Sequence, residues 1–203
     1  RRDEQLASLI AQIFDADDQA WSDAALAVFY TDQDRITMTQ PESAMAASAI
    51  AGFVPRLLFG VMALETGQSA QLIMAQDHNE NGQPDAGSEG TFALDCSSGL
   101  CQGAADVYTL QVKDSAGAEL GELAILAPAL AVDLTAGGEG LHMTVGSLEG
   151  QVAAQALVDM VVAVGGIDEE GATALIKAVY GVVADEALPA TLPFAFSMEV
   201  EAL

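Results

Sequence analysis

A segment rich in Asp, Asn and Gly, residues 77–89, carries the clearest chemical pattern in the sequence. Asp77, Asn79 and Asn81 place oxygen-bearing side chains at alternate positions, and a glycine follows where the chain must turn sharply. Carboxylates, amide oxygens and backbone carbonyls are the ligands that Ca²⁺ prefers in proteins. The spacing therefore predicts a calcium site, and its candidate ligands are Asp77, Asn79, Asn81, Gln83 through its backbone carbonyl, Asp85 and Glu89.

This segment resembles the calcium loops of EF-hand-like, dockerin and thrombospondin type 3 repeats over about a dozen residues. The resemblance implies a carboxylate at the position that Ser88 occupies, and the nearest one, Glu89, comes one residue later. Either Glu89 reaches the ion from a reshaped loop, or water replaces it and the affinity falls toward roughly 0.1–1 mM. Strand-like segments flank the loop, so we expect a structural ion, and Asp77→Ala should destabilise the protein only when calcium is present. The alternative is an Asn-Gly-Pro-rich turn without an ion.

Two cysteines, Cys96 and Cys101, flank a Ser-Ser-Gly-Leu turn between two strand-like segments, which predicts a disulfide across a hairpin. A metal site would need further Cys or His nearby, and a redox pair is normally spaced more closely. Two free thiols are the alternative. Together with the calcium loop, the disulfide indicates an oxidising, extracytoplasmic location: periplasmic, outer-membrane-anchored or secreted. The chain begins Arg-Arg-Asp-Glu-Gln without an apolar segment, so we expect any signal peptide or lipid anchor to have been removed.

No arrangement of residues in the sequence is typical of an active site. The two histidines, His78 and His142, have no nucleophile or ligand set at useful spacing, and the serines in Gly-rich segments lack the Gly-x-Ser-x-Gly pattern. Thirty Asp and Glu against six Lys and Arg give a formal charge of -24, which disfavours binding to nucleic acid. We therefore expect a protein that is not an enzyme and does not bind nucleic acid.

The segment patterns predict an α+β fold in a single domain, residues 1–203, with an antiparallel meander of about five to six strands packed on or around long apolar helices. Helical spacing covers 6–14 and 22–29, and a long apolar segment covers 44–64. The charge of Arg56 and the nearby Pro55 argue against a membrane span there, so we expect a kinked buried helix in which the Arg56 guanidinium is paired or reaches solvent.

The remaining elements divide into strands and two further helices. The helical part covers 1–65, the meander with its calcium loop covers 69–150, and 151–203 holds helices and a closing strand. Strands are expected at 71–76, 91–95, 107–112, 120–126, 130–134, 141–148 and 194–200. Helices are expected at 151–164 and 168–183, with Asp168 as the N-cap of the second.

Hydrophobic residues make up 51% of the chain but aromatic residues only 5%, which predicts a core of small aliphatic side chains with room for a hydrophobic guest. The candidate lining residues are Phe53, Leu57, Leu58, Val61, Met62, Met143, Val158, Val161, Val179 and Met198. The order of the meander, with Leu-His-Met-Thr-Val-Gly-Ser-Leu-Glu-Gly-Gln-Val at its end, then helices and a last strand, resembles the tubular lipid-binding folds.

These patterns lead to three functional hypotheses. The first is an extracytoplasmic domain that binds or transports a lipid or another hydrophobic small molecule, stabilised by calcium and a disulfide. The second is a calcium-stabilised module at the cell surface with a filled core, which interacts with a membrane or surface partner. The third is an enzyme of unknown type.

Overall fold

The computed structural model describes residues 24–41, 50 and 52–203, and a curled antiparallel sheet dominates this part of the chain. Its eleven strands are β1 (Ala27–Thr31), β2 (Ile36–Gln40), β3 (Arg56–Glu65), β4 (Ser69–Asp77), β5 (Gly90–Asp95), β6 (Cys101–Ala104), β7 (Val107–Lys113), β8 (Glu119–Gly137), β9 (Gly140–Ala153), β10 (Thr191–Glu199) and β11 (Glu201–Ala202). A 3₁₀ helix, η1 (Gln33–Arg35), separates the first two strands. The α-helices α4 (Ala154–Gly165) and α5 (Glu169–Tyr180) follow β9.

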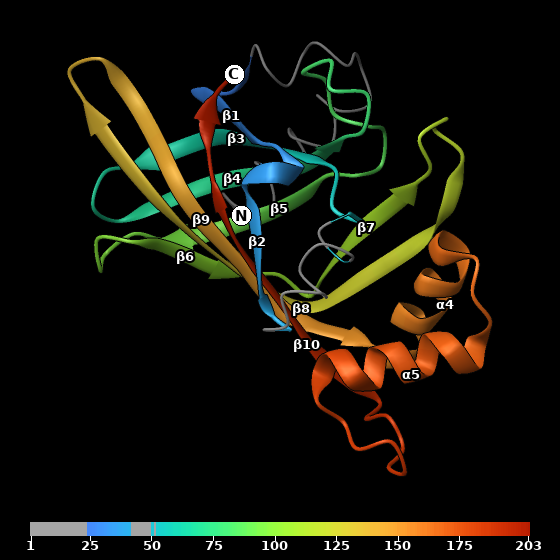
Figure 1. The fold of residues 1–203 in the computed structure, drawn as a ribbon. Helices are drawn as coiled ribbons and strands as arrows, with labels where there is room; N and C mark the ends of the chain where they lie inside the picture. The colour runs from blue at the N-terminus through green and yellow to red at the C-terminus, as the bar shows by residue number, and fades with distance from the viewer. Residues whose placement is uncertain (1–23, 42–49, 51) are drawn as a thin grey trace.

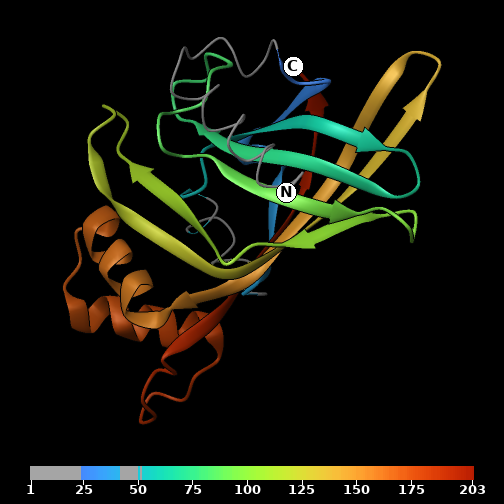
Figure 2. The ribbon, with the colours of Figure 1, turned by 180° about the vertical axis from the view of Figure 1, so that it is seen from behind.

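The strands form a half-barrel in the order β11-β1-β3-β4-β5-β6-β8-β9-β10-β2, and β7 pairs with β8 beside this path (Figure 1). Val200 alone separates β10 from β11, and β11 pairs with β1. The last two strands therefore connect the two ends of the sheet, since β10 pairs with β9 and β11 pairs with β1. Figure 2 shows α4 and α5 at one end of the sheet and the tip of the β8–β9 hairpin at the other.

The expected α+β fold with long apolar helices is wrong, because the described part of the chain is mostly β-structure. Residues 27–29 of the predicted helix 22–29 begin β1, and residues 56–64 of the long apolar segment lie in β3. Both faces of β3 are buried over much of its length, so its sequence lacks the alternation that marks a half-exposed strand. The predicted helix 6–14 and residues 44–49 lie outside the described residues.

Several other elements agree with the sequence predictions. The segments 71–76, 91–95 and 107–112 lie in β4, β5 and β7. The predicted strands 120–126 and 130–134 belong to one long strand, β8, whose register shifts between Leu126 and Ala129. Asp168 is the N-cap of α5, and its side chain accepts a hydrogen bond of 2.8 Å from the backbone N–H of Gly171.

One apolar cluster of buried residues draws on most of the strands and on both α4 and α5. Its largest fully buried side chains include four phenylalanines, Phe59, Phe92, Phe194 and Phe196. The alternate residues of β10 supply Phe194, Phe196 and Met198 to this cluster. The phenylalanines of the described residues are thus concentrated in the core, which the low aromatic fraction of the sequence did not indicate.

A close approach of two strands explains one glycine. β5 pairs with β6 only between Asp95 and Gln102, and β6 then pairs with β8. A Cβ atom on Gly103 would lie 2.1 Å from the backbone oxygen of Ala93, which is far inside van der Waals contact. Only glycine fits where β6 leaves β5 for β8.

Within the described residues, no helix combines the length and the apolar character needed to cross a bilayer.

Candidate calcium loop and its contacts with the sheet

The predicted calcium segment forms the connection between β4 and β5, and its first residue is anchored in the protein interior. Asp77 ends β4 and is fully buried. Its Oδ1 accepts a hydrogen bond of 3.1 Å from the N–H of Asn81, and its Oδ2 accepts one of 2.8 Å from the N–H of Gly82. Gly82 has a φ of +79°, which glycine adopts without strain. The Asp77 carboxylate thus holds the sharp turn that the sequence predicted.

The central part of the loop presents amide oxygens. The Oδ1 of Asn81 accepts a hydrogen bond of 2.9 Å from the N–H of Gln83, and Asn79 is exposed. The side-chain Oε1 of Gln83 is buried, and in the described part of the chain it has no hydrogen-bond donor. A buried acceptor without a donor is normally satisfied by ordered water or an ion.

Asp85 is held by basic groups instead of facing solvent. Its Oδ2 contacts the ring Nδ1 of His78, accepts a hydrogen bond of 3.2 Å from the His78 N–H, and lies 3.5 Å from the Nζ of Lys113. The side chains of Asp85, His78 and Lys113 are only 11%, 13% and 18% exposed. An ion that bound Asp85 would therefore replace contacts that already exist.

The end of the loop is closed by a hydroxyl instead of a carboxylate. Ser88 is 2% exposed; its Oγ accepts a hydrogen bond of 2.9 Å from the N–H of Gln76 and donates one of 2.7 Å to the carbonyl of Asp85. Glu89, the expected late ligand, is exposed. Ser88 therefore serves to fasten the loop to β4.

Gln76 connects this loop to β7, a role that no sequence pattern predicted. Its side-chain Oε1 accepts a 2.8 Å hydrogen bond from the N–H of Gln111, and its Nε2 donates one of 2.8 Å to the carbonyl of Thr109. The amide thus pairs with β7 as a neighbouring strand would. A lone amide at the end of the apolar run 72–75 was the available signal.

Tyr108 and His78 complete the connection between the loop and β7. The Tyr108 hydroxyl donates a hydrogen bond of 2.9 Å to the carbonyl of Ser88, and the ring Nε2 of His78 lies 2.8 Å from the carbonyl of Gln111. Burial raises the pKa of the Tyr108 hydroxyl well above its ordinary value, so the hydroxyl remains protonated and keeps its hydrogen bond to the loop. The loop is therefore joined to β4, β5 and β7.

Arg56 begins β3 and also contacts the loop, through the backbone carbonyl of Glu80. Its Nε donates a 2.7 Å hydrogen bond to Asp32, its guanidinium lies 4.8 Å from the centre of the Tyr30 ring, and one terminal nitrogen donates a 3.3 Å bond to the carbonyl of Glu80. The prediction that Arg56 is paired is confirmed, whereas its placement at a helix kink is wrong. A pocket of about 470 Å³ lies beside Arg56, His78 and Lys113, each of which already contacts a carboxylate.

The loop supplies the kind of donors that a hard cation needs. Its candidate ligand oxygens come from the carboxylates of Asp77, Asp85 and Glu89, from amide side chains and from a backbone carbonyl, which suit Ca²⁺. Within the described residues, no group of three or more His, Cys, Asp or Glu side chains is arranged to hold a metal. The candidate ligands of the loop include amide and carbonyl oxygens besides carboxylates, and such oxygens are chemically suited to calcium.

The residues predicted to line a hydrophobic pocket mostly lie in the core. Phe53, Leu57, Val61, Met143, Val158, Val161 and Met198 belong to the apolar cluster, and Val179 packs against it. Leu58 is fully buried outside this cluster, and Met62 is partly exposed beside an irregularity in β3. The structure thus brings most of these residues together around packed side chains.

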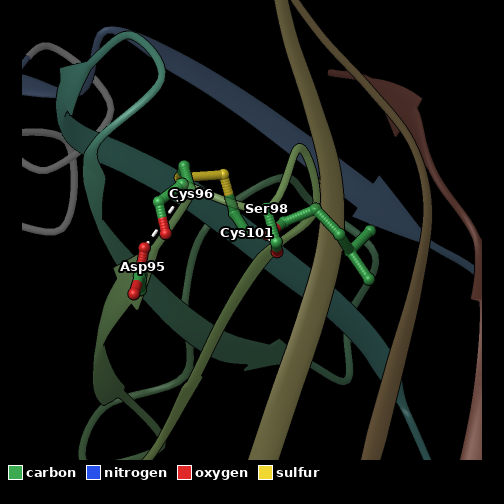
Figure 3. The surroundings of a disulfide bond; sticks show 6 residues. Asp95, Cys96, Ser98 and Cys101 are labelled. Atoms are coloured by element: carbon green, nitrogen blue, oxygen red, sulfur yellow. Dashed lines mark hydrogen bonds between the residues drawn. A yellow bond between two sulfur atoms is a disulfide. The ribbon is translucent and has the colours of Figure 1, made fainter.

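The predicted disulfide joins Cys96 and Cys101 across the turn between β5 and β6, with their Cα atoms 4.0 Å apart (Figure 3). Both cysteines are buried, and Cys101 pairs with Val132 of β8. The Asp95 carboxylate accepts a 2.8 Å hydrogen bond from the N–H of Ser97 within the turn. The bridge therefore fastens the turn at the place where the sheet passes from β5 to β8.

Comparison of the chain with protein families, curated proteins and solved structures found no match.

Proposed function

We propose that this chain is an extracytoplasmic, non-enzymatic β-domain in which residues 77–89 bind Ca²⁺ as a structural ion. The observation that carries the proposal is the buried carboxylate of Asp77, which accepts hydrogen bonds from the N–H groups of Asn81 and Gly82. These bonds preorganise the first ligand and the turn before an ion arrives. The ion would be held by Asp77, Asn79, Asn81, the Gln83 carbonyl and Asp85, with Glu89 or water completing the shell.

The ion would serve the domain by fixing the contacts between the loop and the sheet. Gln76, Ser88 and Tyr108 already link the loop to β4 and β7 through hydrogen bonds. A cation at Asp77 and Asp85 would also reduce the repulsion within a chain of formal charge -24. The buried disulfide and a calcium loop of expected weak affinity both suit a calcium-rich, oxidising compartment.

Calcium titration of the chelator-treated protein tests this proposal directly. With a dissociation constant of roughly 0.1–1 mM, about 5 mM CaCl₂ should stabilise the protein by about 1–2 kcal/mol. Isothermal titration calorimetry should show one ion per chain, and Mg²⁺ at the same concentration should stabilise less. Thermal unfolding curves that coincide with and without calcium would contradict the proposal.

A second candidate function is the binding of a lipid or another hydrophobic molecule inside the half-barrel. It is supported by the apolar cluster of the described residues, which contains most of the predicted lining residues. The phenylalanines at its centre would have to move apart to admit a guest. Native mass spectrometry of protein from its own source, before and after organic extraction, tests this function: a lipid-sized mass lost on extraction supports it, and bare protein counts against it.

A further inference from the structure

Asp85, a candidate calcium ligand of the loop, contacts a basic side chain from a distant part of the chain. Lys113 ends β7, 28 residues after Asp85, and its Nζ lies 3.5 Å from the Asp85 Oδ2. The same oxygen contacts the ring of His78. Asp85 thus has two partly buried basic partners.

The position of Lys113 makes its effect on an ion larger than that of a surface lysine. Its side chain is 18% exposed and that of Asp85 is 11% exposed, so solvent screens their attraction less than it screens an exposed pair. A Ca²⁺ ion bound to Asp85 would either displace the ammonium group or remain close to it. Both alternatives cost free energy and weaken the binding of the ion.

We infer that Lys113 is an affinity-determining residue that competes with Ca²⁺ for Asp85 and couples the loop to the β7–β8 hairpin. This inference rests on the proposed calcium site and adds its regulation. In the ion-free protein, the Lys113–Asp85 contact holds the loop to the end of β7. In the ion-bound protein, Asp85 serves the ion and the ammonium group is released.

The experiment compares Lys113→Met with Lys177→Met. Methionine keeps the length and the apolar stem of lysine but removes the charge. Lys177 is a matched control because its loss changes the net charge equally, while its Nζ donates a 2.8 Å hydrogen bond to the Ala184 carbonyl on the exposed side of α5. Calcium affinity is measured by calorimetry on chelator-treated protein, and stability is measured by urea unfolding in chelator and in saturating CaCl₂.

We expect Lys113→Met to bind calcium about three- to tenfold more tightly than the parent protein, and Lys177→Met to stay within about twofold. The first variant should also lose stability in chelator but not in saturating calcium, because the contact it lacks exists only in the ion-free protein. Equal affinities for the two variants, with calcium bound by the parent, would overturn the role of Lys113 and leave the calcium site intact. Absence of calcium binding in all three proteins would overturn the site itself.

Discussion

The substitution Asp77→Ala separates the two roles of this carboxylate, as a hydrogen-bond acceptor and as a calcium ligand. The sequence alone predicted no loss of stability in the absence of calcium. The structure changes that expectation, because the buried carboxylate accepts hydrogen bonds from two backbone N–H groups of the loop. Removal of the acceptor leaves both donors without it, which should cost about 2 kcal/mol in chelator.

Calcium should then widen the difference between the two proteins. In about 5 mM CaCl₂ the parent gains about 1–2 kcal/mol if its dissociation constant is roughly 0.1–1 mM, whereas Asp77→Ala should gain almost nothing. The total deficit of the variant in calcium is then about 3–4 kcal/mol. Urea unfolding followed by circular dichroism, in chelator and in calcium, measures both quantities.

Asp114→Ala is the matched control for this experiment. The Asp114 carboxylate also accepts two backbone hydrogen bonds, of 2.8 and 2.9 Å from Ala116 and Ala118, but it does so in the exposed β7–β8 turn. Its loss should lower stability slightly and leave the gain from calcium unchanged. The reasoning is refuted if Asp77→Ala keeps the full gain from calcium, or if it is as stable as the parent in chelator.

Three further predictions concern the sheet. Gly103→Ala should lower the free energy of unfolding by about 3 kcal/mol, because the new Cβ would lie 2.1 Å from a backbone oxygen. Gly138→Ala, whose Cβ would have no atom within 4 Å, should change it by less than about 0.5 kcal/mol. The urea unfolding midpoints of the two variants measure this difference. Replacing Cys96 and Cys101 together by alanine should lower the free energy of unfolding by about 2 kcal/mol, which is the loop-entropy value for so short a loop. Reduction of the disulfide in the parent protein should have a similar effect, and unchanged unfolding after reduction would contradict the prediction. Burial raises the pKa of Tyr108, so the folded protein keeps a proton that the unfolded chain releases above about pH 10. The contribution of this group to stability should therefore be fully retained below that pH and fall above it by about 1.4 kcal/mol per pH unit. Tyr108→Phe should reduce this slope when unfolding is measured as a function of pH.

Local patterns predicted the elements whose signals are complete within a few residues. The Cys96–Cys101 bridge, the Asp168 N-cap and the strand at 107–112 need only a turn, a cap or an alternation, and each is present in the structure. The helix predicted over residues 56–64 was wrong because a strand buried on both faces has the same apolar composition as a buried helix. Burial on both faces depends on neighbouring strands that the local sequence does not reveal.

The sequence by itself determined which oxygen-bearing side chains the loop presents, since Asp77, Asn79 and Asn81 are close in the chain and their alternate spacing is local. Only the tertiary structure decided which partners hold that loop. Lys113 contacts Asp85 of the loop across 28 residues of chain. Gln76, at the end of β4, bonds to Thr109 and Gln111 of β7 across 33 and 35 residues. Both contacts form because the curled sheet places β7 beside the end of β4. Contacts between distant residues depend on strand order and on burial of the shared core, and no local spacing encodes either of them.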